Sequence, residues 1–390
     1  MRGVLTALIL VVAASIPLAG SPAGTFARGA RVNRIAGLPS ISVCPAVPAG
    51  EARCLAQVGT PLTPTKAPIG LSPTRFKAVY QFPTSPSAGA GQTIAVVDAF
   101  DDPTAESDLG VFDGQFGLPP CTTANGCFSK VDATGGNHYP KKSGNWALEM
   151  SLDVQWAHAI APGANILLVE AQTNRNADMY AAEDYARTHA QYVSNSWVTN
   201  EYSGERNDDV HFVQPGTSFF AGSGDSGLPP VYPSASPYII SVGGTVLHFD
   251  RSGNFIDETG WHFGGGGCSR YETANPAQAG FSGYAQVHCN GKRATPDVAL
   301  DAAPTRSSGV AVYDGTKYQG YAGWWWVGGT SASTPEWAAR SADAGIVVDA
   351  SAVYSSTITY RDITKGNNGA PCLVGYDLCS GRGSWIGDTP

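Results

Sequence analysis

The sequence has little positive charge, and what there is does not gather into a basic patch. Its 390 residues include 24 lysines and arginines against 32 aspartates and glutamates, a formal net charge of −8. Binding to a nucleic-acid backbone needs clustered Lys and Arg side chains. The composition therefore argues against a nucleic-acid partner.

Long apolar runs are absent beyond the start of the chain. No later segment reaches the roughly 18 uninterrupted apolar residues that a membrane-spanning helix needs. The start, MRGVLTALILVVAASIPLAGSPAG, has one Arg, an apolar run and then small residues suited to cleavage. This layout predicts a secretory signal peptide over residues 1–23, with a lone membrane anchor as the alternative. The mature protein is then expected to be extracellular and not held in a membrane.

The cysteines include no CxxC pair, a spacing common in metal sites. They fall instead as four close pairs: Cys44 with Cys54, Cys121 with Cys127, Cys268 with Cys289, and Cys372 with Cys379. Each pair closes a short loop rich in Pro, Gly or polar residues, and disulfides persist in an oxidising compartment. Neighbour pairing is therefore the favoured interpretation, although sequence alone does not fix the connectivity and metal ligation stays a weaker alternative.

Strand-like and helix-like runs alternate from about residue 90 to 345. Apolar runs such as QTIAVVDAF and ANILLVEA are interspersed with amphipathic ones such as AESDLGVFDGQFG. This alternation predicts an α/β fold with a mostly parallel sheet and helices on both faces. Residues 24–75, rich in Pro, Ala and Gly, are predicted to form an extended lead-in to one domain over 76–390.

Two carboxylates stand four residues apart in an otherwise apolar helical stretch, GNWALEMSLDVQWAHAIAPG. At this spacing Glu149 and Asp153 lie on one helix face, where like charges repel. They could form a water-facing acidic stripe or contact a Lys or Arg of another element. If partly buried, they would share a proton, one pKa rising and the other falling. Such a pair could supply a carboxylate base.

Two further loops follow strand-like runs and carry groups suited to catalysis. GSGDSG holds Asp225, and VGGTSASTPEWAA places Ser331 where a helix begins. Functional groups gather at such strand ends in open α/β sheets. Ser331 could cap its helix, or act as a nucleophile at the positive end of the helix dipole. Its position alone does not separate the two.

No histidine base for Ser331 is found. A serine hydroxyl is a weak nucleophile without a base within hydrogen-bond reach. None of the seven histidines stands in a motif such as HGTH, so the base must come from elsewhere.

Together these motifs resemble the sedolisin family, the serine-carboxyl peptidases. ExxxD with Glu149 and Asp153, SGDSG with Asp225, YPSASPYIISVGGT at 232–245 and GGTSASTP with Ser331 stand in that family's order. The resemblance extends from about residue 75 to 385. It implies a subtilisin-like α/β fold and cleavage of peptide bonds at acidic pH.

The resemblance also implies a role for each residue. Ser331 would be the nucleophile, Glu149 its general base, and Asp153 a group that hydrogen-bonds and tunes Glu149. Asp225 would complete the oxyanion hole as a protonated carboxyl that donates a hydrogen bond. A Glu base suits low pH because a His would already be protonated there. The expected protein is a secreted monomeric serine-type endopeptidase that acts on polypeptides.

Two alternatives remain open at this stage. An exported binding or structural protein could keep the same fold without turnover. Asp98, at the end of TIAVVDAF, suggests a subtilisin-type site, but that site would need a histidine partner. Asp98 is therefore interpreted as a strand-end residue that helps to shape the cleft.

Near the C-terminus, RDITKGNNGAPCLVGYDLCSGRG resembles the family's calcium site. The resemblance implies one structural Ca²⁺ ion held by oxygen ligands: the carboxylates of Asp362 and Asp377, and the backbone carbonyls of Ile363, Leu373 and Gly375. A Gly-rich disulfide loop without metal is the alternative.

Other features fit the resemblance less specifically. GWHFGGGGCSRYE at 260–272 is similar to the family's Gly-rich cleft segment, and the cluster Trp324, Trp325 and Trp326 could line a subsite or pack in the core. The family usually carries a long N-terminal pro-domain, whereas only the lead-in precedes the resemblance here. A pro-domain-poor member is therefore expected, without the familiar autocatalytic activation. The connection from the Ser331 helix to Asp362 is compressed, so a helix there could be shortened or missing.

Overall fold

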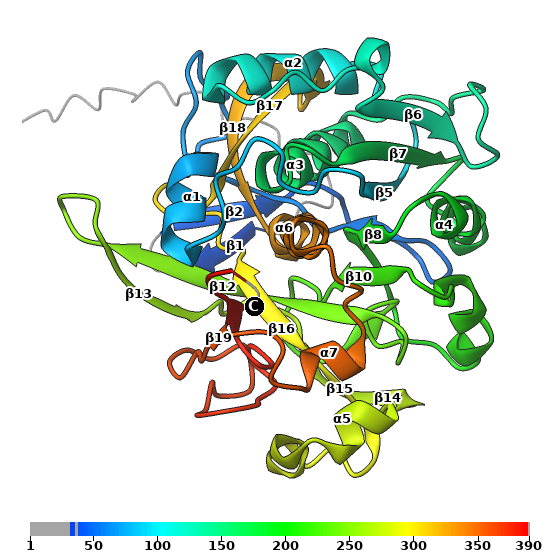
Figure 1. Ribbon diagram of the computed structural model, residues 1–390, viewed down its shortest axis with the longest axis vertical. Coiled ribbons are helices and arrows are strands. Elements are labelled where there is room, and N and C mark those ends of the chain that lie inside the picture. The colour runs from blue at the N-terminus through cyan, green and yellow to red at the C-terminus, as the bar shows by residue number, and fades with distance from the viewer. Residues whose placement is uncertain (1–31, 36–37, 389–390) are drawn as a thin grey trace, which may run out of the picture.

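A large, mostly parallel sheet forms the centre of the fold (Figure 1). The computed structural model describes residues 32–35 and 38–388, so the predicted signal peptide at 1–23 lies outside the described residues. In spatial order the strands are β19 (Tyr360–Arg361), β20 (Ser384–Trp385), β16 (Val298–Asp301), β12 (Ile240–Phe249), β10 (Ser218–Gly222), β8 (Tyr192–Asn195), β5 (Thr93–Ala99), β7 (Asn165–Ala171) and β6 (Phe128–Asp132), with β13 (Phe255–Gly260) beside β12. Neighbours are parallel except β12 with β13 and β19 with β20. The predicted parallel sheet is confirmed.

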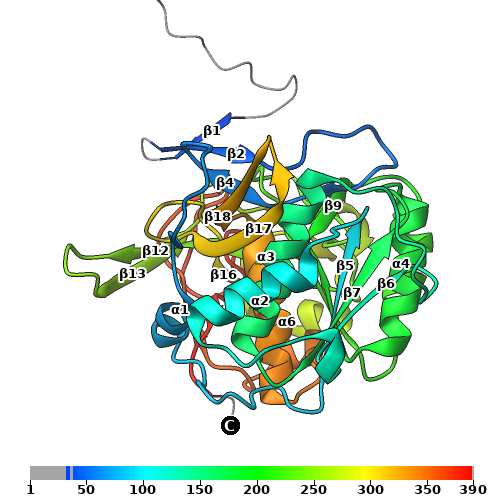
Figure 2. The ribbon, with the colours of Figure 1, turned by 90° about the horizontal axis from the view of Figure 1, so that it is seen from above.

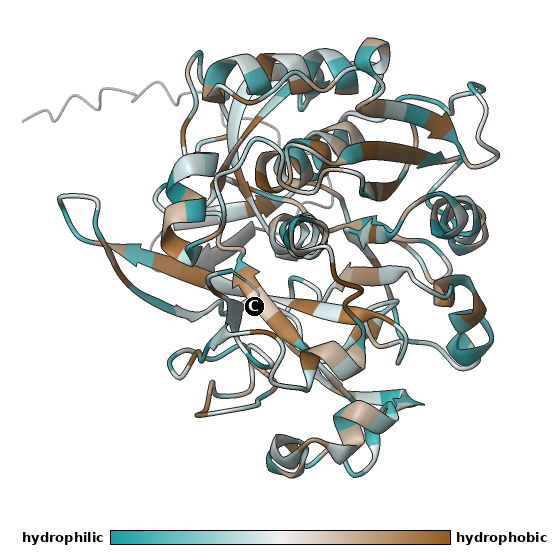
Figure 3. Ribbon diagram, in the orientation of Figure 1, coloured by the Kyte–Doolittle hydropathy of each residue, from teal (hydrophilic) through white to brown (hydrophobic). Residues whose placement is uncertain are grey.

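The central strands are continuous apolar runs. In β5 and β7 every residue after the first is buried, and Figure 3 colours most of this region as hydrophobic. Strands of a parallel sheet covered on both faces have this pattern, because no face is left to water. The carboxylates at the ends of these strands are therefore carried into the interior.

Helices cover both faces of the sheet (Figure 2). Helices α3 (Gly144–Ile160) and α6 (Thr330–Ala344) pack against each other and against one face, while α4 (Asn176–His189) packs on the other. The remaining helical segments are α1 (Pro73–Tyr80), α2 (Ala105–Phe116), α5 (Pro276–Gly280), α7 (Ala350–Val353), η1 (Thr123–Asn125), η2 (Glu205–Asn207), η3 (Asp209–Phe212) and η4 (Ser282–Val287). Within the described residues, none of the helices combines the length and apolar character of a membrane span.

Smaller sheets surround the central one. An antiparallel sheet has the order β1 (Val32–Ile35), β2 (Leu38–Ser42), β4 (Gln57–Gly59), β18 (Tyr321–Gly328) and β17 (Val310–Tyr318). A second joins β11 (Val231–Tyr232), β9 (Trp197–Asn200) and β3 (Arg53–Cys54), and β14 (Gly267–Thr273) pairs with β15 (Lys292–Thr295). Strands β2 to β4 come from the stretch interpreted as a lead-in. They pair with β18 and β9, which border the loops discussed below.

All four neighbouring cysteine pairs form disulfides. Among the described residues, one group of His, Cys, Asp or Glu side chains is close enough to hold a metal: Cys121, Cys127 and His158. Its two sulfur atoms are bonded to each other, so they are not open to a metal. The pairing predicted from short, polar loops is thus confirmed.

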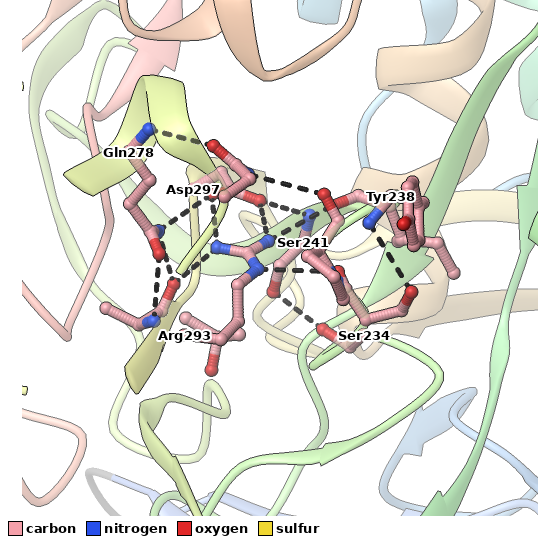
Figure 4. A network of polar contacts seen from close by, with 12 residues as sticks. Ser234, Tyr238, Ser241, Gln278, Arg293 and Asp297 are labelled. Atoms are coloured by element: carbon pink, nitrogen blue, oxygen red, sulfur yellow. Dashed lines mark hydrogen bonds and ion pairs between the residues drawn. The ribbon is translucent and has the colours of Figure 1, made fainter. Parts of the chain in front are cut away.

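The segment YPSASPYIISVGGT is anchored by a buried ion pair (Figure 4). Nη1 of Arg293 donates to Oδ1 of Asp297 at 2.7 Å, and Nη2 donates to the Ile239 carbonyl at 3.0 Å. Oδ2 of Asp297 accepts from the Ser241 N–H at 2.7 Å, and both charged side chains are at most 1% exposed. Charge-assisted bonds of this kind fix the backbone that leads into β12.

The tryptophan cluster on β18 packs in the core. Trp324 is 4% and Trp325 is 2% exposed. The Trp324 ring packs against Phe112 and Phe116 of α2, with ring centroids 6.2 and 5.6 Å apart. These contacts support core packing for these two side chains.

Candidate active site

Glu149 and Asp153 lie in the interior of the protein. Helix α3 is buried from Trp146 through Ile160, and both carboxyl side chains are fully buried. The helix is enclosed by α6, the central sheet and β17. The alternative of a water-facing acidic stripe is therefore wrong, and within the described residues neither carboxylate forms an ion pair with Lys or Arg.

Asp98, at the end of β5, joins these two carboxyl groups. Burial, and then the charges of Glu149 and Glu170, raise its pKa well above the ordinary range. Burial, and then the charges of Asp98 and Glu149, do the same to the pKa of Asp153. The sequence placed Asp98 at a strand end without showing that it faces the α3 carboxyl groups. Three neighbouring buried acids cannot all be ionised, so this cluster holds protons.

The negative charge of the cluster belongs on Glu149. Oε2 of Glu149 accepts the Ala56 N–H at 2.6 Å. Burial raises its pKa to about 8, while the Ser331 hydroxyl and the Ala56 N–H oppose the rise. Hydrogen bonds donated to a carboxyl group favour its charged form, and the carboxyl oxygens of Asp98 and Asp153 lack hydrogen bonds of normal geometry. Glu149 is thus the group that ionises most readily and can act as a base.

Asp153 couples to Glu149 through charge. No direct hydrogen bond joins these two side chains in the described structure, and the Ser196 hydroxyl lowers the Asp153 pKa against the larger effect of burial. The expected Asp153–Glu149 hydrogen bond stays a prediction. If Asp153 is protonated, an ionised Glu149 is not repelled by a second negative charge beside it.

Ser331 does not cap its helix. The N-cap of α6 is Gly329, with a φ of +96°, and no side chain caps the helix. The Ser331 hydroxyl, fully buried at the second position of the helix, donates to the Ser196 carbonyl at 3.4 Å. The Ser331 hydroxyl also lowers the pKa of the neighbouring Glu149 carboxyl, against the larger effect of burial. The capping alternative is therefore removed, and the serine stands beside a carboxylate.

Asp225 follows β10 and faces the start of the same helix. Its Oδ1 accepts the N–H and the hydroxyl of Thr330 at 2.8 and 2.9 Å. A Cβ on Gly329 would lie 2.7 Å from the other oxygen, Oδ2, which therefore points at the turn before Ser331. Burial raises the Asp225 pKa to about 6, although the Thr330 bonds and the charge of Arg53 lower it. At acidic pH this carboxyl is protonated and can donate a hydrogen bond.

Residues 54–56 of the chain itself pack against these groups. Strand β3 pairs antiparallel with β9, and the Leu55 N–H donates to the Ser196 carbonyl at 3.1 Å. The next N–H, of Ala56, is the one that contacts Glu149. The Leu55 carbonyl oxygen lies 2.1 Å from the position of a Cβ on Gly329. Sequence reasoning did not anticipate this, because the segment carries no motif and its partners lie far along the chain.

Two buried or half-buried histidines have partners other than Ser331. His158 contacts the Pro119 carbonyl at 2.9 Å, and His211 lies 3.0 Å from Asp184. In the part of the chain that the structure describes, no histidine side chain hydrogen-bonds Ser331 or Glu149. The geometry agrees with a carboxylate base.

The Gly-rich segment that follows β13 packs against the backbone of the loop that carries Asp225. The Gly265 N–H donates to the Gly224 carbonyl at 2.6 Å, and a Cβ on Gly265 would lie 1.8 Å from the Ser223 carbonyl oxygen. Only glycine allows this approach. The segment therefore positions the loop by close backbone packing.

The residues expected to bind calcium gather around one loop. Oδ2 of Asp362 accepts the Gly375 N–H at 2.9 Å, and Oδ2 of Asp377 accepts the Leu373 N–H at 2.6 Å. Asp362 is exposed, whereas Asp377 and Ile363 are buried. Oδ1 of Asp377 also accepts the Cys379 and Ser380 N–H groups. Both oxygens of Asp377 thus have backbone partners, and calcium binding at this loop stays a prediction.

Fold and site together define a class: a subtilisin-like α/β protein in which a buried serine lies beside buried Glu and Asp carboxyl groups, and no histidine of the described residues hydrogen-bonds that serine. The chain is 27% identical over 368 residues to kumamolisin from Bacillus sp. (strain MN-32). It is 26% identical over 366 residues to sedolisin from Pseudomonas sp. (strain 101), and 26% over 393 residues to xanthomonalisin from Xanthomonas sp. (strain T-22). The resemblance to the sedolisin family is thus confirmed.

These alignments cover most of this chain but less of the relatives. They span 82, 80 and 80% of the chain against 63, 58 and 45% of kumamolisin, sedolisin and xanthomonalisin. The chain thus matches less than two thirds of the length of each. No protein-family model matches it.

Solved structures support the fold. Pseudomonas sedolisin, a serine-carboxyl proteinase complexed with two molecules of pseudo-iodotyrostatin, matches with a TM-score of 0.67 and 24% identity, over 82% of this chain and 96% of that one. A structure described as S41 psychrophilic protease matches with a TM-score of 0.54 and 17% identity, over 83 and 99% of the two chains. The subtilisin-like fold class is confirmed.

Proposed function

We propose that the chain is a serine-carboxyl endopeptidase that hydrolyses polypeptides at acidic pH, as an exported monomer. The observation that carries this proposal is the contact set of Glu149. It is a fully buried carboxyl whose Oε2 accepts the Ala56 N–H at 2.6 Å and whose pKa burial raises and the Ser331 hydroxyl lowers, beside a buried serine that does not cap its helix. The relatives named above are peptidases of this kind, which supports the same reaction type.

In the proposed mechanism Glu149 takes the proton of the Ser331 hydroxyl as the oxygen attacks the substrate carbonyl carbon. The tetrahedral oxyanion receives a hydrogen bond from protonated Asp225. Glu149 then returns its proton to the leaving amine, and an acyl group remains on Ser331. Water, activated by Glu149, releases that acyl group as a carboxylic acid. Asp153 and Asp98 keep the charge on Glu149 by holding their own protons.

The proposed pH range follows from two carboxyl groups in opposite states. Asp225 must be protonated, so activity falls as the pH rises through about 6, the raised pKa of that side chain. Glu149 must be ionised, so activity falls again at strongly acidic pH. In the structure burial raises the pKa of Glu149 to about 8, above the value of about 6 for Asp225. The proposal therefore requires that substrate binding or opening of the site to solvent lowers the Glu149 pKa below that of Asp225, toward the ordinary value of about 4.3. The active window lies between these limits.

Export and calcium complete the proposal. Residues 1–23 would direct secretion, and four disulfides suit an oxidising compartment. Asp362 and Asp377, with the carbonyls of Ile363, Leu373 and Gly375, would hold one Ca²⁺ ion. That ion would supply structural cross-linking of the C-terminal loop and no step of the reaction.

The test is hydrolysis of a denatured protein from about pH 2 to 9, with calcium present. Ser331→Ala and Glu149→Gln are compared with Ser333→Ala, a buried serine of the same helix that donates to the Thr330 carbonyl at 3.1 Å. Activity confined to acidic pH, lost in the first two variants and kept in the third, is expected. An optimum above neutral that survives Glu149→Gln would contradict the mechanism. Folded protein with no turnover at any pH would favour the binding or structural alternative.

A further inference from the structure

We propose that Asn368 is a positioning residue for the reaction, and that it holds the oxyanion loop, residues 223–227, where its Asp225 side chain can reach the oxyanion. This inference rests on the proposed function, because it acts through the same oxyanion donor. Asn368 itself lies in the C-terminal loop, residues 366–379, away from the reacting atoms. One intervening stretch, the Gly-rich segment at residues 263–267, connects the two loops.

Asn368 is buried, and its side-chain amide is bonded at both ends. The residue is 2% exposed. The Ala370 N–H donates to Oδ1 at 3.1 Å, which fixes the opposite end of the amide as the donor. Nδ2 donates to the Leu378 carbonyl at 3.0 Å and to the Gly265 carbonyl at 3.4 Å. One N–H therefore stays within the C-terminal loop, and the other reaches the Gly-rich segment.

The carbonyl that Asn368 reaches also accepts a hydrogen bond from the oxyanion loop. Ser223 Oγ donates to the Gly265 carbonyl at 2.9 Å, and the Gly265 N–H donates to the Gly224 carbonyl at 2.6 Å. Ser223 and Gly224 are the two residues that precede Asp225. A single residue, Gly265, thus connects Asn368 with the start of the oxyanion loop.

Glycines allow the three stretches of chain to lie in direct contact. A Cβ on Gly265 would be 1.8 Å from the Ser223 carbonyl oxygen. A Cβ on Gly266 would be 2.2 Å from the Leu378 carbonyl oxygen and 3.0 Å from Nδ2 of Asn368. No gap separates these stretches, and close-packed groups transmit a shift of one to the next. A displacement of the C-terminal loop should therefore move the oxyanion loop.

The far end of the oxyanion loop meets Asn368 directly. A Cβ on Gly227, whose φ is +68°, would lie 2.5 Å from the Asn368 carbonyl oxygen. The Gly227 N–H donates to the Phe263 carbonyl at 3.0 Å, so the Gly-rich segment also holds this end. Asn368 thus supports the loop at both ends, through its side chain near residue 223 and through its backbone at residue 227. Asp225 lies midway between these two points.

Loss of this support should act on the transition state. An oxyanion donor works when it lies about 2.7 to 3.1 Å from the developing charge, and a misplacement of about 1 Å costs about 100-fold in rate. The Thr330 N–H and hydroxyl hold Oδ1 of Asp225. The contacts to Asn368 hold the backbone that carries this side chain, so both are needed for a fixed donor.

The first measurement compares kcat and KM for a peptide substrate in the natural protein, Asn368→Ala and Asn367→Ala. Asn367 is the matched control, because it is an exposed asparagine of the same loop whose Oδ1 accepts the Gly369 N–H at 2.7 Å. Asn368→Ala should lower kcat by about 10- to 100-fold and change KM by less than about threefold, because the oxyanion forms only in the transition state. The control should keep both constants within about threefold.

A double-mutant cycle separates positioning from a general effect on the fold. Asp225→Ala removes the oxyanion donor and should itself lower kcat by about 10² to 10³. Because Asn368 acts through Asp225, adding Asn368→Ala to Asp225→Ala should lower kcat by less than about threefold further. An equal loss from Asn368→Ala in both backgrounds would mean that this side chain acts by another route, and would overturn the inference.

A second variant covers the case in which Asn368→Ala does not fold. Asn368→Asp keeps the shape of the side chain and the acceptor for the Ala370 N–H, but loses at least one of the two N–H donors. It should lower kcat in the same direction. An enzyme that Asp225→Ala slows, and that neither Asn368 variant slows, would overturn the inference and keep the proposed function. Absence of turnover by the natural chain at any pH would instead remove the proposed function, and this inference with it.

Discussion

Asp225→Asn should keep peptidase activity at a pH where the natural enzyme loses it. Burial raises the pKa of Asp225 to about 6, so the carboxyl loses its proton, and with it the hydrogen bond to the oxyanion, as the pH rises past this value. An asparagine amide donates at every pH. Its carbonyl oxygen can accept the Thr330 N–H, as Oδ1 of Asp225 does at 2.8 Å.

The size of the effect follows from the same pKa. At pH 8, two units above about 6, roughly a hundredth of the Asp225 side chains keep their proton. One oxyanion donor is worth about 10² to 10³ in kcat. The natural enzyme should therefore be roughly 100-fold slower at pH 8 than on its acidic plateau. The variant should lose less than about tenfold over the same range if no other group titrates there.

The assay is kcat/KM for a peptide substrate between about pH 3 and 9, on chains that have been brought to full activity. Asp108→Asn is the matched control, because burial also raises the pKa of Asp108 to about 6 and this side chain lies away from Ser331, where it bonds Thr104 and Gly315. The control should keep the fall in activity near pH 6. An unchanged fall in folded Asp225→Asn, or its loss in Asp108→Asn, would refute the assignment of the alkaline limb to Asp225.

Three further predictions concern the base, the fold and the metal. Glu149→Gln should lower kcat by at least about 100-fold, whereas Glu183→Gln, which removes a buried carboxyl with a pKa also near 8 on α4, should leave kcat within about threefold. Arg293→Met should destabilise the fold by about 3 to 5 kcal/mol in denaturant titrations, because it leaves the Asp297 carboxylate buried without its partner; a loss under about 1 kcal/mol would contradict the structural role of the pair. Calcium chelation should lower the thermal midpoint, and Asp362→Asn should lower it equally while removing its dependence on added calcium; a midpoint insensitive to calcium would remove the metal site.

Much of the fold was predictable because it depends on local patterns. The continuous apolar runs of β5 and β7 and the interspersed helices led to the parallel sheet, and short loops led to the disulfide pairs. The Ser331 and Asp225 loops are also local, since glycines beside them mark tight approaches of the backbone. These patterns could not predict whether the carboxyl groups of α3 are buried, because the sequence was compatible with Glu149 facing either the solvent or the protein interior.

The parts that were not predictable depend on contacts between distant residues. Asp98 and Asp153 meet only because β5 and α3 pack together, and nothing in either segment specifies the other. Arg53 and Cys54 pair with β9, more than 100 positions away along the chain, and no motif marks them. Backbone pairing of this kind uses N–H and C=O groups that every sequence has. It therefore leaves no signal in residue identity, apart from the small side chain of Ala56 and the nearby cysteines.

The buried acids have a consequence for the proton inventory of the molecule. Burial is the first cause of a strongly raised pKa at carboxyl groups on several elements: Asp98, Glu149, Asp153, Glu170, Glu183, Asp301, Asp314 and Glu336. The formal charge of −8 counts all of them as ionised. The folded chain at neutral pH is therefore less negative than its composition states, and folding draws protons from the solvent.

The pKa values of these carboxyl groups are higher in the folded chain than in the unfolded one. Their contribution to the free energy of unfolding is therefore complete below about pH 4. It is lost as the pH rises toward 8 to 9, the range of the folded pKa values of Glu149 and Asp314. The protein should consequently unfold from the alkaline side first. The measured heat of unfolding should also change with the ionisation heat of the buffer, because the carboxyl groups release their protons to the buffer when the chain unfolds.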